Sequence, residues 1–353
     1  MNEHRFPYEW TLKEANFTKD KGKVFSCFAC GGGSTMGYKL AGFDVIGHND
    51  IDKRMIDVYK INHNPRYSFL ESITTFAKRK DLPKELYELD ILDGSPPCSS
   101  FSMAGNREKD WGKEKVFKEG QELQVLDTLF FDFIDLAKEL QPKVVIAENV
   151  KGLLMGEARN YVRKIYTEFD NAGYYCQHFL LDASKMGVPQ RRERVFFIAL
   201  RKDLAKPFLS YVDMFTELPT IKLSFNEKSI TFKEVTNNDL NQELNTTKTA
   251  LKYWHLCKKG DSFSTVSGGS FFNWIRFNEN EVAPTLHTEN GKLYHPDICR
   301  PINNREFALC SSFPLDYNYN EMKTGYICGM SVPPIMTAQI ATEIYNQWLS
   351  KIN

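Results

Sequence analysis

Residues 24–37, VFSCFACGGGSTMG, give a strong local indication of the fold class. Residues 24–29 are mostly apolar and β-prone, residues 30–37 are rich in glycine, and residues 38–41 favour a helix. Glycines let a ligand approach the backbone, and the first turn of a helix offers unbonded N–H groups. A strand, a glycine loop and a helix in this order are typical of nucleotide sites, although this run matches neither the dinucleotide fingerprint nor the Walker loop.

The next segments repeat the alternation of strand and helix. We predict a strand over residues 43–47, a helix over 53–62 and a short strand over 67–70 with Glu71 at its end. The second strand is followed by Asp50, and an acid at this place in such a unit binds the hydroxyl pair of a ribose. Repeated βα units predict an α/β fold with a parallel, doubly wound sheet.

Residues 92–102, LDGSPPCSSFS, follow a short apolar run. We predict a buried strand over residues 90–92 that stops at a turn formed by Asp93 and Gly94 and presents Cys98 on the loop beyond. Two successive prolines fix φ and remove two backbone donors, as suits a rigid loop. Taken alone, the pattern is better explained by an ordinary turn followed by a half-buried cysteine.

A second acid follows the next predicted strand. Residues 121–140 carry apolar side chains at helical spacing, and the apolar run 144–147 ends at Glu148. If the strands before Cys98 and Glu148 are parallel neighbours, both residues lie at the ligand-binding edge of the sheet. An acid at a strand end also commonly caps a helix or joins a salt bridge. Residues 103–120 are polar and long enough to form a loop that closes over a substrate.

The remaining chain divides into two parts. We predict a helix over 158–172 and strands over 174–181 and 195–200, the last preceded by three arginines around Glu193. Those arginines suit either a solvated edge strand or phosphate and carbonyl groups. From residue 206 to 283 the βα alternation is lost, and aromatic and basic residues mix, as in a nucleic-acid surface or the core of a small domain.

Composition gives only broad limits. The 353 residues contain 45 Lys and Arg and 45 Asp and Glu, so a phosphate-binding surface would have to be a local patch. No apolar run is long enough to span a membrane, and the start of the chain lacks the apolar core of a signal peptide. We therefore expect a cytoplasmic protein whose eight cysteines are reduced. Cys27 and Cys30 have zinc or redox spacing without a second pair, so we predict no metal.

Several motifs together resemble the DNA (cytosine-5) methyltransferases. They are residues 28–33, Pro96-Pro97-Cys98, Glu148-Asn149-Val150, residues 190–194, residues 300–314 with Arg305-Glu306, and Gly329-Met330-Ser331-Val332. Their order and spacing match, and the resemblance covers residues 24–349. It implies a Rossmann-like methyltransferase domain over 23–205 after a polar leader, 1–22. It also implies a smaller target-recognition domain over 206–299, and a C-terminal part, 300–353, whose helix 334–348 returns to the large domain.

The resemblance also implies roles for individual residues. Cys98 would be the nucleophile that adds to cytosine and Glu148 the general acid, while Arg192 and Arg194 would hold the base carbonyl and a phosphate. The cytosine would be flipped out of double-stranded DNA, with residues 103–120 closing over it. The implied methyl donor is S-adenosylmethionine. Its predicted contacts are Phe28, Ala29, Gly32, Gly33, Asp50, Ile51, Glu71, Ser72, Asp93, Ser95, Pro96, Leu129, Ser331 and Val332.

The sequence departs from the family at Cys30, where many members have glycine, and at Met330, where most have asparagine. We expect a monomer in a prokaryotic or phage-infected cell, and we expect any cognate restriction endonuclease to act separately. One alternative is the tRNA-methylating branch of the family. A catalytically silent DNA-binding relative is disfavoured by intact Cys98, Glu148 and Arg192, and a nicotinamide dehydrogenase would need a dinucleotide fingerprint.

Overall fold

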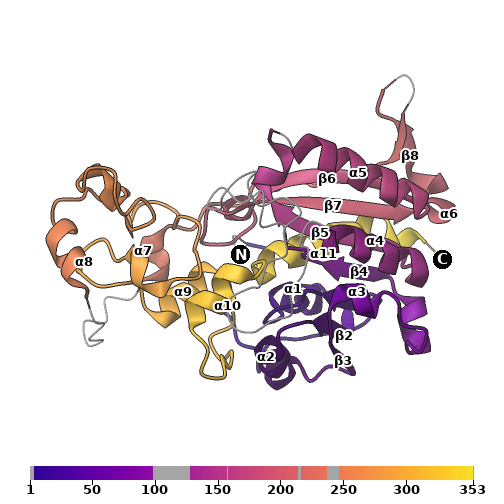
Figure 1. The fold of residues 1–353 in the computed structure, drawn as a ribbon, viewed down its shortest axis with the longest axis horizontal. Coiled ribbons are helices and arrows are strands. Elements are labelled where there is room, and N and C mark those ends of the chain that lie inside the picture. The colour runs from indigo at the N-terminus through magenta and orange to yellow at the C-terminus, as the bar shows by residue number, and fades with distance from the viewer. Residues whose placement is uncertain (1–3, 98–127, 157, 214–215, 237–245, 353) are drawn as a thin grey trace. The chain divides into compact units, whose positions relative to one another are not determined.

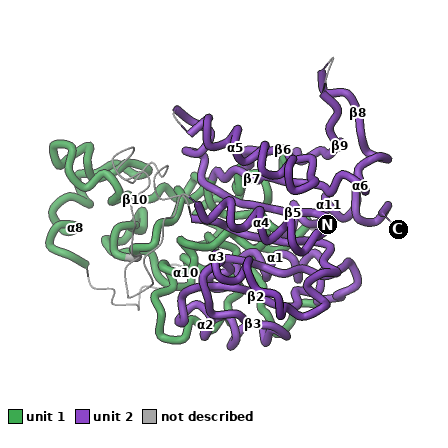
Figure 2. The backbone as a smooth tube through the Cα atoms, turned by 45° about the vertical axis from the view of Figure 1, so that its right-hand side comes forward, with its two compact units in different colours: residues 1–16, 182–192, 225–337 green, residues 17–181, 193–224, 338–353 purple. Residues whose placement is uncertain are grey.

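The computed structural model describes residues 4–97, 128–156, 158–213, 216–236 and 246–352. By contacts the chain divides into two compact units, coloured separately in Figure 2. The sheet unit comprises Phe17–Leu181, Glu193–Ser224 and Ala338–Asn353, and the second unit comprises Met1–Asn16, Asp182–Arg192 and Phe225–Thr337. Each unit is therefore assembled from segments that are distant in the sequence.

The sheet unit is built on seven strands in the order β3-β2-β1-β4-β5-β7-β6 (Figure 1). Neighbouring strands from β3 to β5 pair in parallel, and β7 runs antiparallel to β5. Residues of β1, β4 and β5 are almost all buried, as expected where helices cover both faces. The predicted α/β fold is confirmed. The strands are β1 Lys23–Cys27, β2 Asp44–Asp50, β3 Tyr67–Leu70, β4 Ile91–Gly94, β5 Val144–Val150, β6 Tyr174–Asp182 and β7 Glu193–Arg201.

Helices pack on both faces of this sheet. On one face, Phe76 of α3 stacks on Phe25 with ring centroids 5.5 Å apart, and Phe130 of α4 contacts Phe197 edge to face. Successive side chains of a strand point to opposite faces, so Asp93 points away from the core face that holds Leu92. On this other face the Tyr38 hydroxyl of α1 donates to Asp93. The helices are α1 Gly33–Leu40, α2 Lys53–His63, α3 Ile73–Phe76, α4 Leu129–Leu140, α5 Ala158–Asn171 and α6 Lys202–Ala205.

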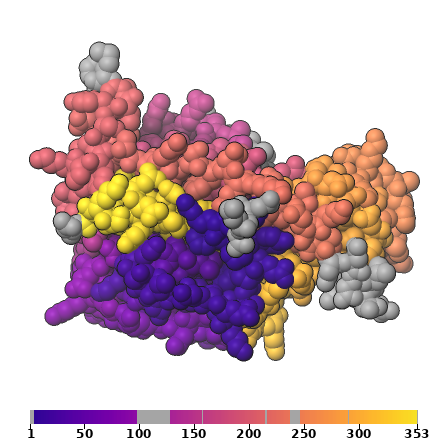
Figure 3. Space-filling view, turned by 180° about the vertical axis from the view of Figure 1, so that it is seen from behind, coloured from indigo at the N-terminus to yellow at the C-terminus, as the bar shows by residue number. Residues whose placement is uncertain are grey.

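The last helix, α11 (Pro334–Gln347), returns to the sheet unit. Its Tyr345 packs edge to face on Phe43, and the Lys21 ammonium lies 4.7 Å from the Tyr345 ring centroid. In the space-filling view the C-terminal residues accordingly adjoin early residues of the chain (Figure 3). The hairpin β8 Leu209–Tyr211 and β9 Glu217–Pro219 belongs to the same unit, and Trp348 Nε1 donates to the Thr220 carbonyl at 2.8 Å. Residues 206–224, which the resemblance assigns to the target-recognition domain, therefore group with the sheet unit.

The second unit has a small aromatic core. Trp254, Phe263 and Tyr294 are buried together, and Trp274 stacks on Tyr294 with centroids 5.8 Å apart. Most of these aromatic side chains therefore serve packing, whereas Phe272 is 66% exposed. The elements of this unit are α7 Phe232–Val235, α8 Lys248–Tyr253, β10 Ile275–Arg276, β11 Leu293–Tyr294, α9 Asn304–Cys310 and α10 Thr324–Met330.

Among the predicted boundaries that differ from the structure, two have a clear physical reason. Helix α1 begins at Gly33, five residues before the predicted start, because Gly32 adopts a left-handed conformation and ends the loop there. Strand β4 continues through Asp93 and Gly94, which pair with both neighbouring strands, so the predicted turn is part of the sheet. A Cβ on Gly94 would lie 2.6 Å from the Phe133 ring, so close packing rather than a turn requires this glycine.

The predicted helix over 121–140 is confirmed from Leu129 to Leu140, and its first part lies outside the described residues, as does the predicted loop 103–120. No helix in the described part of the chain is both long and apolar enough to cross a membrane.

Candidate active site

The carboxyl ends of three parallel strands meet at one edge of the sheet. Cys27 of β1 pairs with Gly94 of β4, and Gly94 pairs with Ala147 of β5, so β1 and β4 end side by side while β5 continues for three more residues to Val150. The prediction that the strands before Cys98 and Glu148 are parallel neighbours is confirmed. Cys98 itself lies outside the described residues, which reach Pro97 at this point.

The loop after β1 has an unusual backbone. Phe28 and Cys30 have φ values of 52° and 49°, and Gly32 has φ 82°. Residues other than glycine rarely adopt this left-handed backbone conformation. Where they do, contacts with the surrounding structure hold the backbone in it. The Cys30 N–H donates to Asp50 Oδ2 at 2.8 Å, and the Gly32 N–H donates to the Ala29 carbonyl at 2.8 Å. The loop is therefore fixed to the end of β2.

Asp50 ends β2 and is half-buried. Its Oδ2 accepts the Cys30 N–H, and its Oδ1 accepts the Asp52 N–H at 2.9 Å. Burial raises the pKa of Asp50 to about 6, although these N–H groups favour the ionised carboxylate. The Ile51 N–H also favours the ionised form, and because a carboxylate offers about four acceptor positions, capacity remains for a hydroxyl group of a ligand. Ile51, predicted to pack on an adenine, is the next residue and is half-buried.

Asp93 is 4% exposed and is held by hydroxyl groups. Its Oδ2 accepts from Ser26 Oγ and Ser34 Oγ, each at 2.7 Å, and its Oδ1 accepts from Tyr38 Oη at 3.0 Å. Burial raises the pKa of this carboxyl to about 6. Asp93 thus ties β4 to β1 and to the first turns of α1, directly behind the glycine loop. The sequence analysis did not identify these partners, and the only signal was a serine within the apolar strand β1.

Glu148 lies on β5 next to Ala147 and forms an ion pair with Arg194. Arg194 Nε lies 2.9 Å from Glu148 Oε1, and the side chains are 16% and 13% exposed. Val150 lies opposite Arg194 in the β5–β7 ladder. Glu148, two residues before Val150 on the same face of β5, is therefore a diagonal neighbour of Arg194, which explains the ion pair. Asn149 Nδ2 donates to the Pro96 carbonyl at 3.1 Å. This bond joins the segment after Glu148 to the loop that leads to Cys98.

Arg192, Ser331 and Val332 belong to the second unit. The Arg192 guanidinium is 3% exposed and donates to the carbonyls of Gly329, at 3.0 Å, and Leu286, at 3.4 Å. Two family motifs that are far apart in the sequence are therefore in contact. The interpretation of the arginines as a solvated edge strand was wrong, because Arg192 is buried and β7 lies between β5 and β6.

The other predicted cofactor residues lie around the same strand ends in the sheet unit. Glu71 follows β3 and pairs with Arg79 at 2.8 Å, while Ser72 caps α3. Ala29, Gly33, Pro96 and Leu129 are buried, and Phe28 and Ser95 are half-buried.

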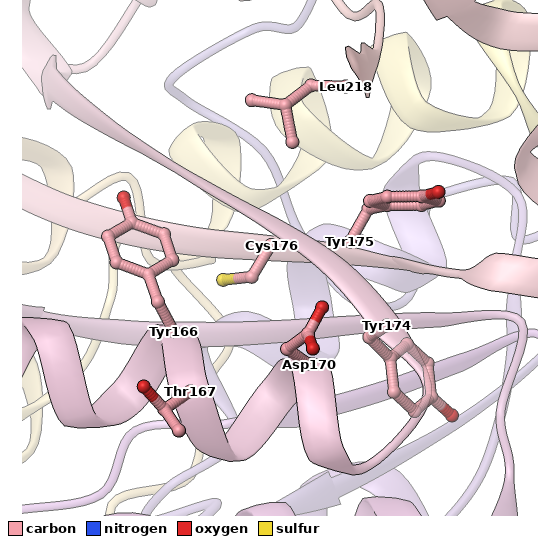
Figure 4. A pocket seen from close by; sticks show the side chains of 7 residues that line it. All are labelled: Tyr166, Thr167, Asp170, Tyr174, Tyr175, Cys176 and Leu218. Carbon is pink, nitrogen blue, oxygen red and sulfur yellow. The ribbon is translucent and has the colours of Figure 1, made fainter. Parts of the chain in front are cut away.

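A surface pocket of 330 Å³ lies elsewhere on the sheet unit (Figure 4). Its lining residues are Tyr166, Thr167, Asp170, Tyr174, Tyr175, Cys176 and Leu218, from α5, β6 and β9. None of them is a predicted site residue, and the exposed Asp170 carboxylate is already paired with Lys202. Among the described residues, no three His, Cys, Asp or Glu side chains gather as metal ligands would.

Comparison with known proteins places these residues in context. A type II methyltransferase of Fusobacterium nucleatum, M.FnuDI, is 37% identical over 183 residues, which are 52% of this chain and 48% of the relative. The chain spans a similar share, 50%, of M.NgoPII from Neisseria gonorrhoeae, at 36% identity. M.DdeI from Desulfomicrobium norvegicum matches further, with 25% identity over 91% of this chain and 88% of its own length.

Solved structures share the fold. A protein described as a DNA modification methyltransferase encoded within an E. coli prophage superposes with a TM-score of 0.63 at 22% identity, covering 92% of this chain and 99% of its own. A Spodoptera frugiperda DNMT2 variant gives 0.62 at 17% identity, with the same coverage. The family model described as C-5 cytosine-specific DNA methylase matches residues 22–346. With nearly its whole length matched, this chain belongs to the C-5 cytosine-specific DNA methylase family.

Proposed function

We propose that this protein methylates carbon-5 of a cytosine in double-stranded DNA, with S-adenosylmethionine as the methyl donor, in a restriction–modification or DNA-marking system. The main support is the Glu148 carboxylate. It lies near the carboxyl end of β5, two residues before Val150, is oriented by Arg194 at 2.9 Å, and is on the strand next to the one that leads to Cys98.

The residues at the strand ends fit the proposed donor. Asp50 retains acceptor capacity for a ribose hydroxyl group, and α1 begins beside it with no side chain capping its first N–H groups. Phe28 follows β1 and packs on Phe133 of α4, with ring centroids 6.4 Å apart. When bound, S-adenosylmethionine would supply an electrophilic methyl group.

The chain's own residues would supply the activation. Carbon-5 of cytosine is a poor nucleophile, so the Cys98 thiolate would form a bond to carbon-6 and make carbon-5 electron-rich. Glu148 would hold a proton at the neighbouring ring nitrogen, and Arg194 would keep that carboxyl oriented. After methylation, loss of the carbon-5 proton and cleavage of the sulfur–carbon bond would release the product. The base must leave the duplex for this chemistry, so we propose that it is flipped.

The covalent step can be tested by trapping. Fluorine at carbon-5 cannot leave as a proton, so DNA with 5-fluorocytosine at the target should form a complex with the wild type that survives denaturing electrophoresis. Formation should require S-adenosylmethionine. Cys98→Ser should form none, because a hydroxyl is almost wholly protonated at neutral pH. A wild-type enzyme that methylates ordinary DNA without being trapped would refute the covalent mechanism.

The substrate requires its own experiment. Methylation-aware sequencing of DNA from cells that express the protein should reveal a defined methylated sequence, absent from cells that express Cys98→Ser. Parallel assays on unmodified tRNA test the alternative that the protein methylates tRNA. Methylation of tRNA without methylation of DNA would show that the substrate is RNA.

A further inference from the structure

Three aromatic side chains form a stack behind the glycine loop. His48 of β2 lies parallel to Tyr59 of α2 with ring centroids 3.5 Å apart, and His63 meets the Tyr59 ring at 4.6 Å and 65°. All three side chains are at most 7% exposed. We call these residues the His–Tyr stack.

The stack contacts the glycine loop and the first turn of α1. His63 Nε2 lies 3.2 Å from the Gly31 carbonyl oxygen, which can only accept, so Nε2 carries the proton and donates it. Burial lowers the pKa of His63 well below its usual range, so the ring is neutral. Tyr59 Oη lies 2.8 Å from Thr35 Oγ1.

The shape of the loop depends on the same ring. A Cβ on Gly32 would lie 2.3 Å from His63 Nε2, so the ring occupies the space that glycine leaves. On the other side, Asp50 accepts the Cys30 N–H at 2.8 Å. The left-handed residues are therefore held between a donor from α2 and an acceptor from β2.

We propose that His63 is a positioning residue for binding of the methyl donor. It holds the Gly31 carbonyl and so fixes the turn in which Cys30 meets Asp50. Its effect on donor binding rests on the proposed function, whereas its effect on the loop does not.

Two substitutions isolate the hydrogen bond. His63→Leu removes the donor at similar volume, and His63→Gln restores an N–H near the position of Nε2. We expect His63→Leu to weaken S-adenosylmethionine binding about tenfold in calorimetry, the scale of one hydrogen bond to a fixed loop. The turnover number at saturating donor should change less than about twofold, and His63→Gln should bind within about threefold of the wild type.

His48→Leu is the matched control. His48 belongs to the same stack and is equally buried, but its Nε2 bonds to Ser68 Oγ at 2.8 Å, away from the glycine loop. We expect this substitution to lower the melting temperature without weakening donor binding. If both Leu variants lose donor affinity in proportion to lost stability, His63 has only a structural role and the proposal is wrong.

Hydrogen exchange of the protein without donor tests the loop itself. Backbone amides of residues 28–33 should exchange faster in His63→Leu than in the wild type or His48→Leu, and His63→Gln should restore protection. Unchanged exchange in His63→Leu would overturn the inference even if the protein methylates DNA. A wild type that binds no S-adenosylmethionine would instead refute the proposed function, while the exchange result would still decide the role of His63.

Discussion

Glu148→Gln should separate catalysis from folding. Glutamine retains an oxygen that can accept from Arg194 Nε but loses the negative charge, so the ion pair becomes a hydrogen bond from the charged guanidinium to a neutral amide. Both side chains are mostly buried, and we expect the free energy of unfolding to fall by about 1–2 kcal/mol. A protein stable by about 5–15 kcal/mol remains folded after such a loss.

Turnover should fall far more than stability. Loss of a general acid costs about a hundredfold or more, equivalent to about 2.7 kcal/mol of activation free energy. The assay is single-turnover methylation of a duplex carrying the target, with donor binding measured separately and expected to remain unchanged. A near-normal single-turnover rate in Glu148→Gln would remove this residue from the mechanism.

Glu193→Gln is the matched control for this prediction. Glu193 lies next to Arg194 in β7, but its side chain is 47% exposed and its partner is the equally exposed Lys151, at 2.8 Å. Exposed ion pairs contribute little, so we expect stability to change by less than about 0.5 kcal/mol and turnover by less than about twofold. A comparable loss of turnover in Glu193→Gln would show that general charge near β7, rather than the Glu148 carboxyl, controls the reaction.

Other consequences can be tested separately. The raised pKa of Asp50 means that protons compete with ligand hydroxyls for its carboxylate, so donor affinity should fall as the pH drops through about 6. Asp50→Asn should bind weakly and lose most of that dependence in calorimetry, and an unaltered pH profile would exclude Asp50. Gly32→Ala should clash with His63 and destabilise the protein by at least about 2 kcal/mol more than Gly173→Ala in thermal unfolding. Gly173 is the control because it has a similar φ of 91° but open space around it, and equal losses would contradict the predicted clash. Exchange of residues 225–283 for the segment of a relative should change the methylated sequence in methylation-aware sequencing while activity persists, and an unchanged sequence would place recognition elsewhere.

Local patterns predicted most of the sheet unit. The strands and helices before residue 201 follow from apolar periodicity, and the adjacency of β4 and β5 follows from their βα connections. Features that depend on distant packing were not predicted. The local sequence predicts a turn at Gly94, because the Phe133 ring that packs on this glycine comes from a later helix. It predicts a solvent-exposed Arg192, because the carbonyl groups that bind this side chain belong to Leu286 and Gly329, 94 and 137 residues away.

Cys30 illustrates how such distant contacts make an unfavourable local choice tolerable. A residue with a Cβ at a φ of 49° costs about 1–2 kcal/mol relative to glycine. In this chain the Cys30 N–H is held by Asp50, and its Sγ lies 3.5 Å from Met55 Sδ in α2. His63, on the same helix, holds the following carbonyl. Because α2 contacts both Cys30 and Gly31, the strained loop is stabilised by a helix that begins more than 20 residues later, and that dependence is not apparent from the glycine run alone.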